Sequence, residues 1–105
     1  MTEAEDKTAA LLARLWVKVR PLVEERLVTL DRASAAAASG ALDEDLRREA
    51  VGSAHKLAGS LGMYGYDEGT RVARELEALL GAAAPDPARL HALIVQLRQA
   101  VFPAD

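Results

Sequence analysis

Apolar residues recur at intervals of three and four along almost the whole chain, and proline or glycine interrupts the pattern at a few places. This spacing places the apolar side chains on one face of an α-helix, whereas a half-buried strand would require strict alternation. No segment of convincing length alternates in that way. We therefore predict an all-α fold in which amphipathic helices bury their apolar faces against one another.

Two helices are predicted before Gly40. The first runs from about 3 to 20, because Thr2 and Glu5 stand at the spacing of a capping box and an amphipathic pattern follows them. Pro21 ends or kinks this helix, and it is also acceptable in the first turn of a second helix. Gly40 is a typical C-terminal stop for that second helix.

Three further helices are predicted after Gly40. Asp67 and Asp86 are expected to be N-caps, and Gly81 is expected to end the helix that follows Asp67. The predicted segments are a third helix over 41–62, a turn over 62–69, a fourth helix over 71–80 and a fifth helix from Pro87 to about Val101.

The length of the chain leaves room for one core only. A chain of 105 residues has the size of a single domain, and we place its helical core at about 8–101. Because only 4% of the residues are aromatic, β-sandwiches and base-stacking nucleic-acid modules are disfavoured, whereas abundant alanine and leucine favour closely packed helices. The expected architecture is an antiparallel, up-down four-helix bundle with an additional N-terminal helix.

Charge and cysteine content narrow the possible partners. Thirteen basic and sixteen acidic residues give a formal net charge of -3, so no broad basic surface is expected to bind nucleic acid or anionic lipid. The chain has no cysteine, and neither a signal peptide nor a membrane span is recognisable in the sequence. We expect a soluble cytoplasmic protein that is a monomer.

His55 lies just outside the apolar face of the predicted third helix. On a helical wheel it falls about 40° beyond the edge of that face, which covers an arc of about 140°. Its neighbours on the same side are Gly52, Gly59 and Gly62, and glycine costs about 1 kcal/mol relative to alanine within a helix. An imidazole among bare backbone is accessible to a partner protein, and it can carry a phosphoryl group on a ring nitrogen. Equally, an exposed histidine can be an ordinary surface residue, and helical glycines can serve close packing. The apolar face consists of Leu46, Ala50, Val51, Ala54, Leu57, Ala58 and Leu61.

Residues 54–65, AHKLAGSLGMYG, resemble the signature of histidine phosphotransfer (Hpt) domains in its HKLAGS form. The segment RVARELEALL (71–80) resembles the helix that follows in that family. The resemblance implies a four-helix bundle in which His55 accepts a phosphoryl group from a receiver aspartate or a histidine kinase and passes it to another receiver. The chain departs from the family at Ala58, where many members have a lysine.

The remaining candidate residues surround His55 in the sequence. The expected supporting residues are Lys56, Gly59, Ser60 and Gly62, and the expected partner-binding residues are Arg48, Gly52, Leu61 and Met63. Lys56 and Arg48 would contribute positive charge, although both residue types are also common on a solvated helix face. The glycines would let the partner's loops approach, and the two apolar side chains would add contact area. The resemblance and the small size of Ser60 indicate packing for that residue.

The sequence contains no nucleotide-binding loop and no carboxylate cluster at metal spacing. We therefore expect a phosphocarrier without autonomous kinase activity or a cofactor of its own, whose Mg²⁺ is supplied by the partner receiver. Two other interpretations remain: a non-catalytic interaction module, and a metal-binding bundle that uses His55 and His91. The metal-binding bundle is disfavoured because the chain has no cysteine and no Glu-x-x-His motif. A hydrolase is disfavoured because no serine has an evident base.

Overall fold

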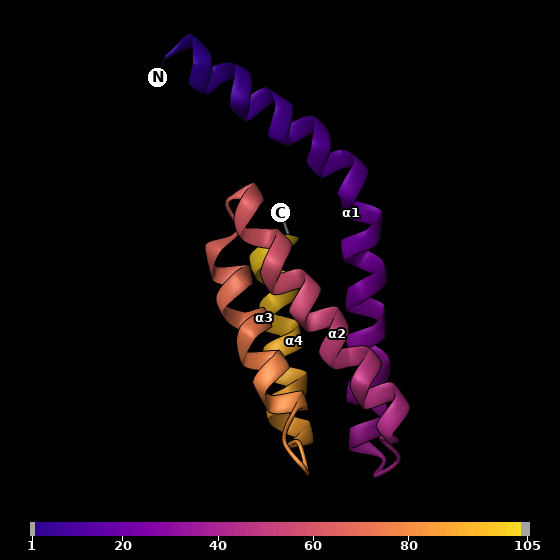
Figure 1. The fold of residues 1–105 in the computed structure, drawn as a ribbon. Coiled ribbons are helices and arrows are strands. Elements are labelled where there is room, and N and C mark those ends of the chain that lie inside the picture. The colour runs from indigo at the N-terminus through magenta and orange to yellow at the C-terminus, as the bar shows by residue number, and fades with distance from the viewer. Residues whose placement is uncertain (1, 104–105) are drawn as a thin grey trace.

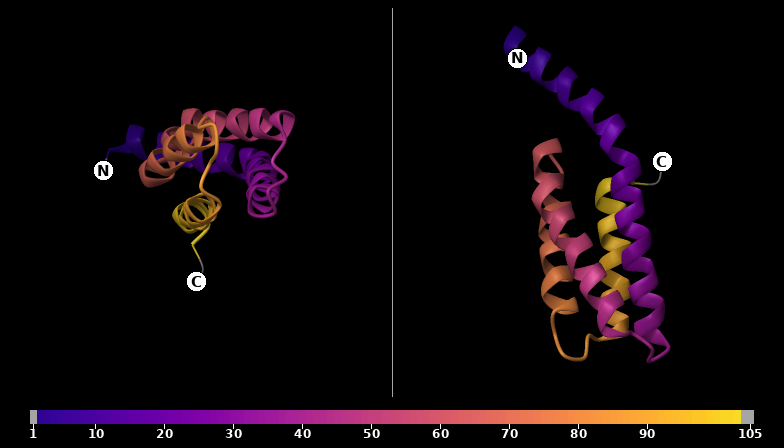
Figure 2. Two further views of the ribbon diagram at one scale, coloured as in Figure 1. Left: turned by 90° about the horizontal axis from the view of Figure 1, so that it is seen from below. Right: turned by 45° about the vertical axis from the view of Figure 1, so that its right-hand side comes forward.

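The computed structural model describes residues 2–103 and contains four α-helices, with no strand in that part of the chain. Helix α2 packs against α1 and α3, and α4 packs against the same two helices, so that the four form a bundle (Figures 1 and 2). Short connections join consecutive helices at alternate ends of the bundle. The all-α prediction is confirmed. The elements are α1 (Glu3–Ala38), α2 (Glu44–Leu61), a short 3-10 helix η1 (Gly62–Tyr64), α3 (Asp67–Leu80) and α4 (Pro87–Val101).

Helix α1 continues through Pro21, so the prediction of two helices and a separate N-terminal helix is wrong. Proline has no backbone N–H, and the carbonyl of Val17 therefore loses its partner within the helix. Val17 is 71% exposed, and water can bind that carbonyl instead. The helix bends along its length, and its N-terminal part extends beyond the other helices (Figure 1).

Side chains cap the N-termini of three helices, two of them at residues predicted from the sequence. Thr2 and Glu5 form a reciprocal capping box with two hydrogen bonds of 3.2 Å. Asp86 accepts a hydrogen bond of 3.1 Å from the backbone N–H of Ala88. The third cap, Asp43, begins α2 by accepting a hydrogen bond of 2.8 Å from the backbone of Leu46. The prediction for Asp67 is wrong, because the N-cap of α3 is Tyr66 and Asp67 is the first helical residue.

Glycines terminate two of the helices as predicted. Gly40 follows the C-cap of α1 with a φ of 72°, a left-handed conformation that glycine adopts without strain. Gly81 is the C-cap of α3. A third glycine, Gly65, has a φ of 84° and turns the chain from η1 into α3. This turn positions α3 beside α2.

All four α-helices contribute to the core. The predicted apolar face of α2 is confirmed for Ala50, Ala54, Leu57, Ala58 and Leu61, while Leu46 and Val51 are partly buried. In α4 the apolar residues that recur at intervals of three and four are all buried; they are Leu90, Leu93, Ile94, Leu97 and Val101. The N-terminal part of α1 has no helix opposite it, so some of its apolar side chains are exposed, including Leu15. Leu22 is also exposed, beside a groove between α1 and α2.

Two sets of contacts hold α1 in place. The ring of Trp16 lies 5.3 Å from that of Tyr64 and 4.8 Å from that of Tyr66, measured between centroids. Further along α1, Asp31 accepts two hydrogen bonds, of 2.9 and 2.7 Å, from the guanidinium group of Arg98 on α4. This bidentate geometry fixes the relative position of the two helices more strongly than a single contact would.

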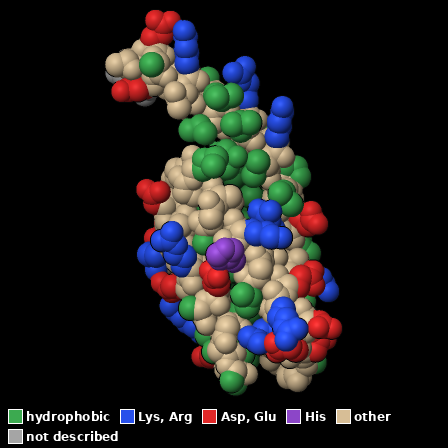
Figure 3. Space-filling view, viewed as in Figure 1, with side chains coloured by type: hydrophobic (Ala, Val, Ile, Leu, Met, Phe, Trp, Pro, Cys, Tyr) green, Lys and Arg blue, Asp and Glu red, His purple; other side chains and the backbone are tan. Residues whose placement is uncertain are grey.

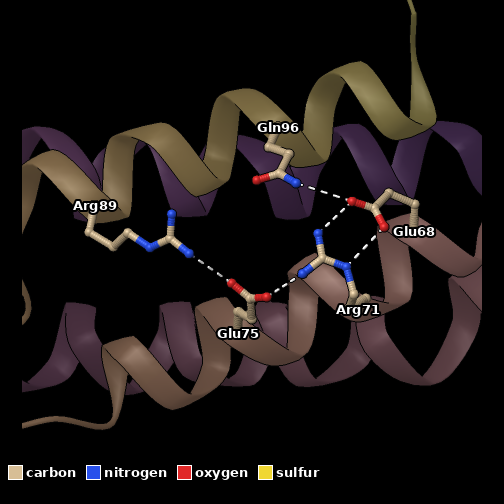
Figure 4. A network of polar contacts seen from close by, with 5 residues as sticks. All are labelled: Glu68, Arg71, Glu75, Arg89 and Gln96. Carbon is tan, nitrogen blue, oxygen red and sulfur yellow. Dashed lines mark hydrogen bonds and ion pairs between the residues drawn. The ribbon is translucent and has the colours of Figure 1, made fainter.

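A polar network joins the exposed sides of α3 and α4 (Figure 4). Arg71 binds Glu68 and Glu75 on its own helix. From α4, Arg89 donates a hydrogen bond of 3.0 Å to Glu75, and Gln96 donates one of 3.1 Å to Glu68. The Arg71 hydrogen bond lowers the pKa of Glu68 below its usual value. Within residues 2–103, none of the helices combines the length and the apolar composition that a membrane span requires.

Candidate functional site

His55 lies on the exposed side of α2, as the helical wheel predicts. Its side chain is 73% exposed, whereas the adjacent Ala54 and the nearby Leu57 are buried in the core. These buried neighbours fix the rotation of α2 about its axis and so direct His55 outward. In the space-filling view, the histidine on this face lies beside one acidic group, with basic side chains to either side (Figure 3).

Glu77 on α3 contacts the imidazole ring directly. Its Oε2 lies 2.9 Å from Nδ1 of His55, and its side chain is 33% exposed. An ionised carboxylate can only accept hydrogen bonds, so Nδ1 is the donor. In the neutral imidazole this arrangement places the proton on Nδ1 and leaves the lone pair on Nε2. The nitrogen free of Glu77 is therefore the nucleophilic one.

A shallow pocket of about 150 Å³ lies between α2 and α3 beside the histidine. Arg74 supplies the one basic side chain in its lining, and Ala58 and Gly59 provide a surface without bulk or charge. The complete lining is His55, Ala58, Gly59, Arg74 and Glu77. A small anionic group can enter this space and meet both the imidazole and a guanidinium.

The glycines near His55 differ in what surrounds them. A Cβ atom added at Gly52 or Gly59 would meet nothing within 4 Å, so neither glycine is required for helix packing. At Gly62 the added atom would lie 3.3 Å from Oγ1 of Thr70, which places Gly62 at a contact with α3. Gly69 is the closely packed glycine, because its added Cβ would lie 3.1 Å from a methyl group of Val101. Of the three expected glycines, Gly59 lines the pocket beside His55, whereas Gly52 lines the groove between α1 and α2.

The structure does not bring Lys56 or Arg48 to the pocket at His55. Both side chains line a different groove, of about 420 Å³, between α1 and α2. Arg48 also forms an ion pair with Glu44 at 3.2 Å. The hydrogen bond from Arg47 lowers the pKa of this same glutamate below its usual value.

The other expected contact residues have different environments. Leu61 is 0% exposed, so its predicted role in partner binding is wrong: its side chain packs in the core against the backbone at Gly69. Met63 in η1 is exposed. Ser60 is half-buried, and its hydroxyl donates a long hydrogen bond of 3.5 Å to the carbonyl of Leu57.

Sequence reasoning missed the two α3 residues at the pocket, Arg74 and Glu77. They stand three positions apart and therefore share one face of α3. That spacing was visible in the sequence, but it does not reveal that this face meets α2 at His55. His91 is exposed on α4. Within the described residues no group of three or more His, Cys, Asp or Glu side chains could hold a metal ion.

Comparison with known proteins agrees with this geometry. The model of the Hpt domain family matches residues 14–101, which include all of α2, α3 and α4 and most of α1. The searches of curated proteins and of solved structures returned no match. Because the matched segment covers well over half of the sequence and contains His55, the chain belongs to the Hpt domain family.

Proposed function

We propose that His55 is the phosphoryl acceptor of a phosphorelay and that it exchanges the group with the aspartate of a receiver domain. The observation that carries this proposal is the hydrogen bond of 2.9 Å between Nδ1 and Glu77, which leaves Nε2 without this contact on a side chain that is 73% exposed. An exposed neutral imidazole is a competent nucleophile near neutral pH.

The transfer requires no group to leave or join apart from the phosphoryl group itself. The Nε2 lone pair attacks the phosphorus of an aspartyl phosphate, and the P–O bond to the carboxyl group breaks with its electrons on oxygen. The new P–N bond gives the ring a positive charge, because the Nδ1 proton stays in place. The carboxylate of Glu77 stabilises that charge through its hydrogen bond. In the reverse direction the same proton remains on Nδ1 and the ring becomes neutral again.

The partner would supply the rest of the site. Phosphoryl transfer depends mainly on alignment and on neutralisation of charge. We propose that the receiver contributes Mg²⁺ and its acidic pocket, and that Gly52 and Gly59 let its loops approach the ring. Exposed Met63 adds an apolar contact at the edge of the same region. On this view the protein is a cytoplasmic, monomeric carrier without kinase activity of its own.

The alternative is an interaction module that binds a receiver or a kinase without being phosphorylated. The experiment that separates the two incubates the protein with a phosphorylated receiver and follows transfer of the label. Acid-labile, base-stable phosphate should appear on wild type and on the control His91→Gln, but not on His55→Gln. Binding of the receiver without any label on His55 would support the interaction module. Label retained by His55→Gln would refute the assignment of the acceptor.

A further inference from the structure

A phosphoryl group on His55 would lie close to the negative charge of Glu77. A phosphoryl group on Nε2 carries up to two negative charges at neutral pH. Glu77 places a third negative charge on the other side of the same ring, 2.9 Å from Nδ1. Without a nearby cation, the Glu77 carboxylate would repel the incoming phosphoryl group, although the same carboxylate orients the ring that accepts it.

The pocket beside His55 contains one basic side chain. Arg74 lines it together with Ala58, Gly59 and Glu77, whereas Lys56 lines the groove on the α1 side of α2. Ala58 is one turn beyond His55 on α2, but its side chain ends at Cβ and has no charge. Among the pocket's lining residues, only Arg74 can offset a negative charge there.

The guanidinium of Arg74 is also available to a ligand. Its neighbour on α3, Arg71, binds Glu68 and Glu75, and Arg98 on α4 binds Asp31. Across residues 2–103, Arg74 forms no ion pair, although its side chain is exposed and Glu77 is only three positions away. A cation without a partner at the opening of an acceptor pocket can bind an anion without first breaking an existing contact.

We propose that Arg74 binds the phosphoryl group carried by His55. The inference rests on the proposed function and adds a residue of α3 to it. Two N–H groups of one guanidinium can donate to two non-bridging phosphoryl oxygens, a geometry that a lysine cannot reproduce. Arg74 then offsets the charge of the group on Nε2, while Glu77 offsets the charge of the ring. The two residues make the α2–α3 pocket complementary to a phosphorylated imidazole.

The test uses phosphoramidate, a small donor that needs no protein partner. Nε2 displaces ammonia from its phosphorus, so the loading rate reports on the pocket alone. Arg74→Ala should lower this rate about tenfold. This is near the lower end of the effects expected when a hydrogen-bonded charged group is lost, because the site is exposed. The loading rate of Arg74→Lys should lie between the rates of Arg74→Ala and wild type. Arg71→Ala is the matched control, since it removes a cation from the same helix outside the pocket, and its rate should stay close to wild type.

A second measurement excludes a purely structural effect. In a ³¹P NMR titration, the phosphoryl group should ionise at a higher pH in Arg74→Ala than in wild type, because a guanidinium favours the dianion. A wild-type rate together with an unchanged titration midpoint in Arg74→Ala would overturn the proposal. An equal loss of rate in Arg71→Ala would also overturn it, since charge at a distance would then suffice. Failure of wild type itself to be labelled, with phosphoramidate or a receiver, would instead overturn the proposed function.

Discussion

Gly59 lies within α2 one turn beyond His55, and its replacement tests why glycines flank the acceptor. In the structure a Cβ at this position would meet nothing within 4 Å. Alanine therefore fits without strain, and it removes the conformational entropy that glycine loses on folding. The expected gain is about 0.8–1.0 kcal/mol in the free energy of unfolding, the usual difference between the two residues inside a helix. In a domain of this size the melting temperature should rise by roughly 4–8 °C.

Urea denaturation of wild type, Gly59→Ala and Gly69→Ala measures this difference directly. Gly69 is the control, because an added Cβ would lie 3.1 Å from Val101 and 3.2 Å from Leu61 in the core. Gly59→Ala should be more stable than wild type, whereas Gly69→Ala should gain less or lose stability. A loss of stability in Gly59→Ala would refute the reasoning, because it would mean that packing requires the glycine.

The same position tests the access of the partner. Gly59→Leu should fold with unchanged helix content, but it should lose transfer from a phosphorylated receiver. The leucine side chain would occupy the open surface that the receiver's loops need. Circular dichroism and urea denaturation of the variant would establish that the loss of transfer does not result from unfolding. Normal transfer from the receiver in a folded Gly59→Leu protein would contradict the access argument.

Three further predictions concern other parts of the bundle. Thr70→Val should raise the free energy of unfolding by about 1 kcal/mol in urea denaturation, because the buried Oγ1 has no hydrogen-bond partner among the described residues, and a loss of stability would reveal such a partner. Glu68 has a folded-state pKa below its usual 4.5, so its contribution to stability is present above that pH and decreases as the pH falls through the lowered pKa. Urea denaturation at a series of pH values should therefore give a shallower acid dependence for Glu68→Gln, and identical profiles would contradict this. Glu77→Ala should lower the rate of phosphoramidate loading several-fold, because the Nδ1 proton is no longer fixed, and an unchanged rate would remove Glu77 from the mechanism.

Local rules predicted most of the helices. The capping box at Thr2 and the N-cap at Asp86 could be identified from the sequence because each satisfies backbone groups within one turn. The apolar spacing of α2 and α4 predicted their buried faces for a similar reason. Pro21 was misinterpreted because the outcome depends on solvent access to the carbonyl of Val17, which is a property of the folded bundle.

Only the part of the candidate site that lies on α2 could be predicted from the sequence. The position of His55 and the open glycines beside it depend on the geometry of a single helix, which a helical wheel represents. Glu77 and Arg74 depend on which face of α3 meets α2 and at what height, and no local pattern contains that information. Leu61 was predicted to bind the partner for a related reason. The sequence does not show that Gly69 lets α3 approach closely enough to cover the Leu61 side chain.

The central claim is that His55 carries the phosphoryl group on Nε2 while Glu77 holds Nδ1. The most direct test is to phosphorylate ¹⁵N-labelled protein from a receiver and to identify the bonded nitrogen by ³¹P–¹⁵N coupling. We expect a single phosphorylated site, Nε2 of His55, with the Nδ1 proton still present. Phosphate on Nδ1, on His91 or on no histidine would contradict it.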